Sequence, residues 1–360
     1  MNISRLVLMI SEDCNFSCSY CYHQREKKEM SRDTAEKALD FFLPRMPKSK
    51  NLYFLGGEPL LNFDLVRHAV GYIEKKRSRR HKNIGLNIST NGSLITSEIL
   101  DFFNHHRFTV ELSFDGLAQE KGRMKGSFQH LVDTIKKTMT CPNIRLVVNS
   151  VFFPRTIGIL SDSIRFILDL GVPHLSLGLA LDRRWNRPSI DRFEIEFTHL
   201  MNILTDHYRK TGNQPLRFFP DLSSNGIWCC SAGQSQLTVS AAGEVWGCAL
   251  FYEYFRHRRT LDIHRDYCFG AIEELSDNHK YSVNVIKHYK QLCQDNVHTD
   301  RSRCFLCPHI DFCGVCPISS ALYWDRLDRI PDYICRINRI AIIEKQKFKD
   351  RIDKIDGRNN

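Results

Sequence analysis

The sequence has no long apolar run. No stretch of its 360 residues approaches the roughly 20 apolar residues that a membrane-spanning helix needs. The apolar segment 6–10 is too short for the hydrophobic part of a secretory signal, and Glu12 and Asp13 follow it closely. We therefore expect a cytoplasmic protein that does not enter a membrane.

Acidic residues are too few to balance the basic ones. The 51 Lys and Arg residues against 41 Asp and Glu give a formal net charge of +10. Such an excess favours an anionic partner such as nucleic acid or an acidic peptide. The basic residues are spread out, however, with local runs only at 75–82 and 256–259. A solvated surface is therefore the favoured interpretation, and nucleic acid is not an expected partner.

Cysteine is nearly absent from the middle of the chain. Only Cys141 lies between Cys21 and Cys229, whereas three cysteines lie at 14–21 and ten at 229–335. Disulfides are rare in the cytoplasm, so clustered cysteines there indicate metal or redox chemistry. The step in cysteine content also predicts a domain boundary. With 42% hydrophobic residues, the chain can bury a sizeable core.

The N-terminal part alternates between two patterns. Short β-rich apolar runs occur at 3–10, 51–55, 84–89, 109–114, 144–152 and 174–180. Helical spacing occurs at about 31–43, 63–80, 96–106, 127–139, 157–170 and 190–210. This alternation predicts βαβ units and a parallel sheet, either doubly wound or closed into a partial barrel. In both arrangements the chemistry belongs at the C-terminal ends of the strands.

Polar residues gather at those strand ends. Residues 14–21 follow the first run, 56–59 the second, 89–92 the third and 113–116 the fourth, and Asn149 lies late in the fifth. The sequence therefore predicts one active site ringed by strand ends.

Cys14, Cys18 and Cys21 form a C-x3-C-x2-C pattern on the loop after the first run. Three thiolates leave a tetrahedral zinc site incomplete, but they can hold three irons of a 4Fe–4S cluster and leave the fourth open. The alternatives are three incidental buried cysteines, or a zinc site completed by His23.

On this loop the sequence resembles the radical S-adenosylmethionine (radical SAM) superfamily, whose signature has this spacing. The resemblance implies an α/β fold with a partial (β/α)6 barrel and a 4Fe–4S cluster on Cys14, Cys18 and Cys21. The open iron would bind SAM, and reductive cleavage of SAM would give a 5′-deoxyadenosyl radical. The residues that match the family's SAM-contacting positions are Tyr20 by the adenine, Gly56 and Gly57 as close-approach glycines, Glu58 for the amino group, Ser89, Asn91 and Ser113 for the ribose or carboxylate, and Arg123 near the carboxylate.

A second cysteine pattern begins at residue 229. Cys230 and Cys248 form C-x12-G-x4-C around an expected hairpin at 237–248, and a C-x2-C-x5-C-x2-C run spans 304–316 before Cys335. Taken alone, this pattern suggests a zinc ribbon. Beside a radical SAM core it resembles the SPASM extension, which carries auxiliary 4Fe–4S clusters. The family usually has three residues, not two, between the last two close cysteines.

The SPASM resemblance implies two auxiliary clusters. One would be held by Cys304, Cys307, Cys313 and Cys335, and the other by Cys230, Cys248 and Cys316. Cys229, Cys268 or an open iron would complete the second. Cys141 and Cys293 match no motif and are expected as small core residues. The expected domains are a core barrel at 1–212, a SPASM domain at 213–337 and a C-terminal helix at 338–360.

The resemblance implies a peptide maturase that forms a thioether or carbon–carbon cross-link. The alternatives are a sulfatase-type formylglycine maturase and a peptide epimerase, and a non-catalytic Fe–S or zinc protein that binds nucleic acid represents a different class. Ala249 after Cys248 replaces the sulfatase type's aspartate, which disfavours that role. The expected partners are a peptide or protein substrate, a reductant such as flavodoxin or ferredoxin, and a separate leader-peptide-binding protein.

Overall fold

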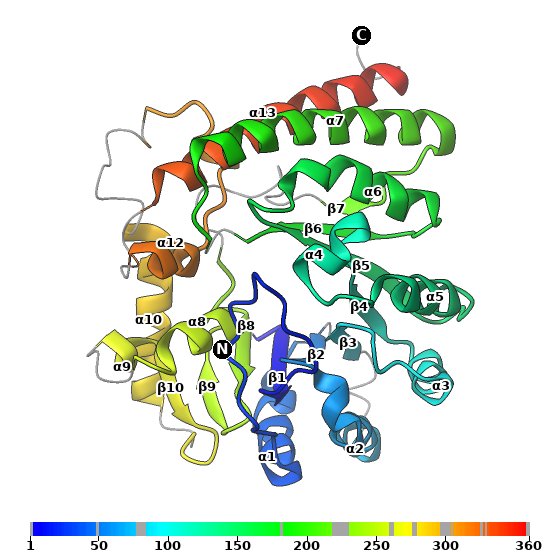
Figure 1. Cartoon of the computed structure of the whole chain (residues 1–360). Coiled ribbons are helices and arrows are strands. Elements are labelled where there is room, and N and C mark those ends of the chain that lie inside the picture. Colours follow the sequence, from blue (N-terminus) through cyan, green and yellow to red (C-terminus); the bar gives the residue numbers. More distant parts are fainter. Residues whose placement is uncertain are drawn as a thin grey trace.

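The computed structural model of the protein has an α/β fold. Its strands form a partial barrel, and a C-terminal region extends the same sheet. The structure describes residues 3–47, 50–76, 84–180, 183–217, 230–258, 263–275, 279–295, 304, 306–324, 327 and 330–357. Within these ranges one sheet runs in the order β10-β9-β8-β1-β2-β3-β4-β5-β6-β7. Figure 1 shows the strands following one another around the molecule, with helices on their outer side.

Seven parallel strands form the barrel part of the sheet. They are β1 (Arg5–Ser11), β2 (Lys50–Gly56), β3 (Ile84–Thr90), β4 (Thr109–Ser113), β5 (Arg145–Phe152), β6 (Leu175–Leu179) and β7 (Leu216–Arg217). On the other side of β1, β8 (Gln236–Val239) pairs in parallel, and β9 (Glu244–Trp246) and β10 (Cys268–Ala271) add antiparallel. The C-terminal region therefore continues the sheet of the barrel.

Helices connect the parallel strands and cover the C-terminal region. The first group is α1 (Arg32–Phe42), α2 (Phe63–Lys75), α3 (Ser97–His105), α4 (Gln119–Gly122), α5 (Phe128–Met139), α6 (Leu160–Asp169) and α7 (Arg187–Thr211). The second is α8 (Ala249–Phe255), α9 (Ile263–Tyr267), α10 (His279–Asp295), α12 (Pro317–Trp324) and α13 (Asp332–Ile355). Short 3-10 turns occur at Leu43–Arg45, Pro59–Asn62, Gly116–Ala118, Ile157–Ile159 and Ile310–Phe312.

The predicted elements are confirmed. Each of the six apolar runs overlaps a strand, each of the six helical patterns overlaps a helix, and the expected hairpin is β8–β9. The terminal helix also forms, but α13 begins at Asp332, six residues before the predicted start at 338. It lies along α7 (Figure 1). Pro331 sits at its N-cap position, where a missing N–H costs nothing.

Local sequence explains why these elements form where they do. Ser31 caps α1 by accepting a hydrogen bond from Thr34 N at 3.0 Å. The same helix buries Ala35, Ala38 and Leu39, which share one face at helical spacing. In β1, by contrast, every residue from Leu6 to Ser11 is buried, as in a strand covered on both faces.

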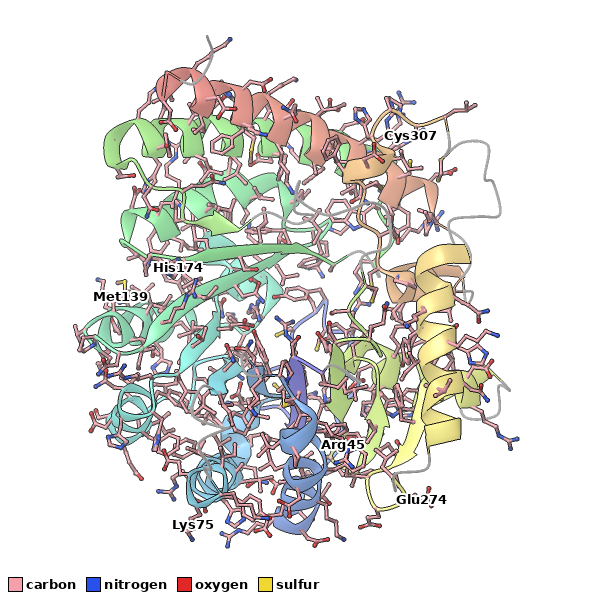
Figure 2. The ribbon with its side chains drawn as sticks, turned by 180° about the vertical axis from the view of Figure 1, so that it is seen from behind. Arg45, Lys75, Met139, His174, Glu274 and Cys307 are labelled. Atoms are coloured by element: carbon pink, nitrogen blue, oxygen red, sulfur yellow. The ribbon has the colours of Figure 1, made fainter. Side chains whose placement is uncertain are left out.

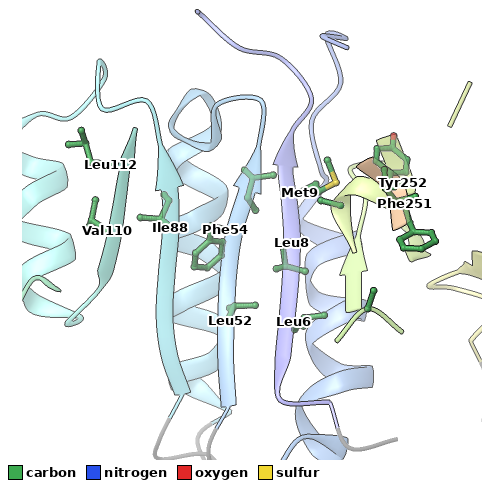
Figure 3. Close-up of a cluster of buried hydrophobic side chains, with 14 of the residues drawn as sticks. Leu6, Leu8, Met9, Leu52, Phe54, Ile88, Val110, Leu112, Phe251 and Tyr252 are labelled. Atoms are coloured by element: carbon green, nitrogen blue, oxygen red, sulfur yellow. The ribbon is translucent and has the colours of Figure 1, made fainter. Parts of the chain in front are cut away.

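The hydrophobic core runs across the parallel strands of the sheet. Figure 3 shows Leu6, Leu8, Leu52, Phe54, Ile88, Val110 and Leu112 side by side on neighbouring strands, with Phe251 and Tyr252 of α8 beyond β8. All of these side chains are buried. Burial of this kind contributes about 1.5–3 kcal/mol per large apolar side chain and fixes the strand ends relative to one another.

The boundary predicted at 212/213 follows the end of α7. Gly212 ends that helix in a left-handed conformation with φ 65°. Because β8 pairs with β1, the residues after this point are not a separate sheet. The three-part division at 212 and 337 stays a prediction. Among the residues that the structure describes, no helix is long and apolar enough to cross a membrane.

Candidate radical SAM site

A cavity of about 490 Å³ opens at the carboxyl ends of the parallel strands. Its described lining comes from the loop after β1, the ends of β2 to β6, and helices α8 and α12. Ten of the predicted site residues line it: Cys14, Cys18, Tyr20, Cys21, Gly56, Gly57, Ser89, Asn91, Ser113 and Arg123. The strand-end residues thus surround one cavity.

Three thiols stand on one wall of this cavity. Cys14 and Cys18 are half-buried and Cys21 is exposed. Burial raises the pKa of Cys14, and it raises the pKa of Cys18 to about 11 although Arg123 acts in the opposite direction. The neighbouring thiols raise both pKa values further. Binding a metal here must therefore release protons.

This arrangement fits a 4Fe–4S cluster, whose cysteine ligands bind separate irons. Among the side chains that the structure describes, no three of His, Cys, Asp or Glu converge closely enough to share a single metal ion. His23, which the zinc alternative requires, has both ring nitrogens engaged. Its Nδ1 faces the Glu253 carboxylate, and its Nε2 lies 2.8 Å from the main-chain oxygen of Glu12. The geometry therefore disfavours a zinc site.

Two glycines at the end of β2 let the cysteine loop approach the backbone. Gly57 N donates to Ser11 O and Glu58 N to Asp13 O, both at 2.8 Å. A Cβ at Gly56 would lie 2.1 Å from Ser11 O, and one at Gly57 would lie 2.3 Å from Asp13 O. Only glycine fits at these two positions. The end of β2 thus seats the start of the cysteine loop.

Glu58 is fully buried and supports the residues around it. Its Oε1 accepts from Thr90 Oγ1 at 2.7 Å and from Leu60 N at 3.1 Å, and its Oε2 accepts from Asn91 N at 2.7 Å. It is not among the described residues that line the cavity. Contact between Glu58 and the SAM amino group stays a prediction. The observed bonds fix the turn at Thr90 and Asn91.

The buried carboxyl of Glu58 predicts a pH effect on stability. Burial outweighs its hydrogen bonds and raises its pKa to about 7, above the ordinary 4.5. Its contribution to stability is therefore fully present below pH 4.5 and is lost as the pH rises through about 7. The expected loss in free energy of unfolding is about 3 kcal/mol.

Glu58→Gln should remove this pH-dependent component, since the amide does not titrate. The measurement is the free energy of unfolding of wild type and variant at about pH 5 and about pH 8. The exposed Glu98→Gln, which alters a surface pair with Arg67, is the matched control. A Glu58→Gln variant with the wild-type pH dependence would contradict the prediction.

Tyr20 and Arg123 meet at a carboxylate that lies under the cavity. Asp115, fully buried, accepts from Tyr20 Oη at 2.7 Å, from Arg123 Nη2 at 3.0 Å and from Val151 N at 2.8 Å. Arg123 also lies over the Tyr20 ring, 5.4 Å from its centroid. Burial lowers the pKa of the guanidinium, but Asp115 more than offsets this and keeps it charged. Asp115 therefore orients two cavity-lining side chains.

The remaining predicted SAM contacts stand at adjacent strand ends. Ser89 is the last but one residue of β3, two positions before Asn91, and Ser113 ends β4; both serines are half-buried and line the cavity. Asn91 Nδ2 donates to Asn15 Oδ1 at 2.8 Å and lies 3.8 Å from Cys14 Sγ. Asn91 thus ties the end of β3 to the cysteine loop.

The C-terminal thiols fall into two sets by their mutual electrostatic effects. Burial raises the pKa of Cys248 most, followed by the effects of Cys230 and Cys316. Burial likewise raises the pKa of Cys313 to about 12, with Cys335, Cys304 and Cys307 adding to it and a hydrogen bond from Asn338 opposing it. The two ligand sets that the resemblance implies group these thiols in the same way, and their role as cluster ligands stays a prediction. Figure 2 shows Cys307 near the beginning of α13, which carries Cys335.

The other cysteines are placed differently. Cys268 is buried in β10, and its Sγ accepts from Gly270 N at 3.4 Å. Cys229 and the side chain of Cys293 lie outside the described residues. Cys141, expected in the core, is only half-buried because it follows the last turn of α5 at the surface.

Tyr289 of α10 holds the backbone next to Cys230 and Cys248. Its hydroxyl donates to Tyr267 O at 2.7 Å and accepts from Gly247 N at 2.9 Å. Its ring fills the space that a Cβ at Gly233 or Gly247 would enter, at 2.2 and 2.4 Å. Gly247 directly precedes Cys248 and Gly233 follows Cys230 by three residues, so Tyr289 supports the backbone near both thiols.

Tyr289→Phe is expected to destabilise the protein by about 1–3 kcal/mol, because it leaves two buried main-chain groups without a partner. Urea unfolding of the metal-free protein measures this loss. The control is Tyr208→Phe, which removes a near-surface hydroxyl bonded to Asp356 and should change stability by less than about 0.5 kcal/mol. Equal effects of the two substitutions would contradict the role assigned to Tyr289.

The sequence pattern placed Asp115 at a strand end, within 113–116, but gave it no role, and it pointed neither to Tyr289 nor to the engaged ring nitrogens of His23. Asp115 follows the fourth apolar run in Ser113-Phe-Asp-Gly, so its position at a strand end was a usable signal. Nothing local marks Tyr289, since its partners lie 22 and 42 residues away along the chain.

Comparison with known proteins agrees with this geometry. The family model described as the radical SAM superfamily matches residues 8–167. A cysteine-type anaerobic sulfatase-maturating enzyme of Clostridium novyi is 25% identical over 320 residues, which cover 80% of this chain and 81% of that protein.

Two solved structures share the fold over nearly the whole chain. The protein anSMEcpe, solved with bound AdoMet, superposes with a TM-score of 0.77 at 18% identity, covering 98% of this chain and 99% of that one. SuiB of Streptococcus suis, bound to its precursor peptide SuiA, gives a TM-score of 0.65 at 16% identity and covers 93% and 76%. These likenesses confirm the partial barrel with a cysteine-rich C-terminal region and a terminal helix. With its three-cysteine loop seated at the strand ends inside the matched region, the chain is an enzyme of the radical SAM superfamily.

Proposed function

We propose that this enzyme modifies a ribosomally made peptide, most simply by forming a thioether or carbon–carbon cross-link. The observation that carries the proposal is that one cavity is lined both by the three-cysteine loop and by residues of the cysteine-rich C-terminal region. SuiB and anSMEcpe have the same fold and were each solved with a peptide bound.

Cys14, Cys18 and Cys21 would hold the 4Fe–4S cluster, and the lining residues Tyr20, Asn91 and Arg123 would orient SAM beside it. When bound, the cluster and SAM supply a 5′-deoxyadenosyl radical that can abstract a hydrogen atom from the substrate. Asp115 would keep Arg123 and Tyr20 in place during binding.

The apolar part of the cavity lining would exclude water. It includes Leu55, Val151, Leu179, Leu250 and Leu322. Exclusion of water and of free thiols protects a reactive radical from quenching. Leu250 and Leu322 come from α8 and α12, so the C-terminal region would close the site over the substrate.

We further propose two auxiliary 4Fe–4S clusters. Cys304, Cys307, Cys313 and Cys335 would hold one, and Cys230, Cys248 and Cys316 would hold the other. The grouping of the thiols by their mutual effects on pKa supports this division. An external one-electron donor such as flavodoxin or ferredoxin, and a separate leader-peptide-binding protein, would complete the system.

Formylglycine formation is the second candidate, because the Clostridium novyi relative is a sulfatase-maturating enzyme. Cross-linking is favoured by the residues after Cys248. Ala249 is buried there and Leu250 lines the cavity, so neither position offers a carboxylate to act as base.

The test uses synthetic peptides encoded beside the gene, with deuterium at candidate carbon positions. The proposal predicts that deuterium appears in 5′-deoxyadenosine and that the peptide loses two hydrogens without gaining a hydrazine-reactive aldehyde. An aldehyde product would favour the formylglycine maturase, and an unchanged mass with inverted stereochemistry would favour the epimerase. If deuterium is transferred to 5′-deoxyadenosine from none of the peptides, the proposal is wrong.

A further inference from the structure

A buried polar cluster joins the three-cysteine loop to α8. Glu12, two residues before Cys14, is fully buried. Its Oε1 accepts from Tyr252 Oη at 2.5 Å, and its Oε2 accepts from Arg256 Nη1 at 2.9 Å. Tyr252 lies in the last turn of α8 and Arg256 follows it at the C-cap. Figure 3 shows Tyr252 beside the end of β1 from which this loop departs.

Arg256 reaches both ends of the segment 12–24. Besides binding Glu12, its Nη2 donates to the main-chain oxygen of Gln24, and its Nε lies 3.4 Å from Glu253 Oε2. The other Glu253 oxygen faces His23, whose Nε2 lies 2.8 Å from Glu12 O. The segment between Glu12 and Gln24, which contains all three cysteines of the loop, is therefore clamped at both ends.

Because the charged groups of Glu12, Glu253 and Arg256 are buried, their relative positions are tightly constrained. The side chains of Glu12, Glu253 and Arg256 are 0%, 4% and 3% exposed. A charge this deep is tolerated only when it is paired, so the planar five-donor guanidinium of Arg256 fixes where its partners lie. A different position of α8 would leave a buried carboxylate without its partner.

The same short helix contacts two other parts of the molecule. It begins directly after Cys248, whose thiol lies near Cys230 and Cys316. One residue into it, Leu250 lines the cavity. α8 is thus bonded to the three-cysteine loop at its end and adjoins the C-terminal thiols at its start.

We propose that Arg256 is a positioning residue: through Glu12 and Gln24 it sets the geometry in which the loop of Cys14, Cys18 and Cys21 binds its cluster and SAM. The cysteine-rich region then shapes the SAM site through α8. This inference rests on the proposed role of the three cysteines as cluster ligands.

Two measurements test the proposed role of Arg256, and the first of them needs no cofactor. The first is the rate of trypsin cleavage at Arg25, Lys27 and Lys28 in the metal-free protein. The second is the dissociation constant of SAM in the anaerobically reconstituted protein, together with the change that SAM causes in the electron paramagnetic resonance spectrum of the reduced cluster. Arg256→Met should raise the cleavage rate and weaken SAM binding by about tenfold each, because a clamped segment opens.

Arg258→Met is the matched control, since Arg258 donates to Tyr254 O at 2.9 Å and stacks over the Tyr254 ring within α8. It should leave both readouts within about twofold of wild type. Arg256→Lys, which restores the charge without the fork, should recover part of both effects.

A folded Arg256→Met protein with wild-type cleavage and SAM binding would overturn the inference. If that variant lacks the far-ultraviolet circular dichroism of a folded protein, Glu12→Gln, which keeps the shape and removes the charge, decides the question by the same two readouts. A wild-type protein that loads iron on other cysteines and binds no SAM would instead overturn the proposed function, while the cleavage rates would still test the clamp.

Discussion

Gly57→Ala is expected to reduce reductive SAM cleavage by more than about a hundredfold, because a displacement of about 1 Å at reacting groups is enough for such a loss. The new methyl would lie 2.3 Å from Asp13 O and 3.1 Å from Cys14 Cβ. The first contact involves backbone, which has no rotamer to relieve it. The cysteine loop must therefore shift, taking Cys14 with it.

The stability cost of Gly57→Ala should be modest, about 1–3 kcal/mol, as for other overpacked sites. The control is Gly71→Ala, since Gly71 lies within α2 with nothing within 4 Å of its added Cβ. That change should leave SAM cleavage unaltered and stabilise the helix by about 0.5–1 kcal/mol. A Gly57→Ala enzyme that cleaves SAM at nearly the wild-type rate would show that the cysteine loop does not depend on its close approach to Gly57.

Asp115→Asn is expected to destabilise the protein by about 3–5 kcal/mol, because it leaves the buried Arg123 without its counter-ion. The amide can still accept from Tyr20, so the ring should be less disturbed than the guanidinium. Arg123 lines the cavity, and loss of its anchor should also weaken SAM binding by about tenfold. Urea unfolding and equilibrium binding of SAM measure the two effects separately.

The matched control for this prediction is Asp133→Asn on the exposed face of α5. Asp133 accepts a hydrogen bond from Gln129 at 3.0 Å near the solvent, so its loss should change stability by less than about 0.5 kcal/mol. If Asp115→Asn behaves like this control in both measurements, Asp115 does not position the site.

Strand and helix placement could be predicted from the sequence because it is encoded locally. The parallel strands are continuous apolar runs, and the helices between them carry an apolar stripe at helical spacing. The strand-end polar residues then follow from topology, since parallel strands place their carboxyl ends together. The predicted start of α13 was wrong by only six residues. The helix begins directly after Pro331, a boundary that hydrophobic periodicity does not mark.

The supporting residues could not be predicted in this way. Arg256 bonds to Glu12 across 244 residues, and Tyr252 bonds to it across 240. Such contacts depend on how β8 and α8 return beside β1, which no local pattern specifies. The division of the C-terminal cysteines between two clusters likewise stays a prediction, because the spacing between Cys313 and Cys316 is one residue shorter than is usual in the SPASM pattern.

The central claim is that the loop of Cys14, Cys18 and Cys21 performs reductive SAM cleavage. The most direct measurement is the amount of 5′-deoxyadenosine formed by anaerobically reconstituted protein with SAM and dithionite. The account predicts that wild type and Cys141→Ala form the nucleoside and that the variant with Ala at 14, 18 and 21 forms none. Formation of 5′-deoxyadenosine by the triple variant would contradict the account. So would the absence of this nucleoside when the iron-loaded wild type is given a peptide that it modifies.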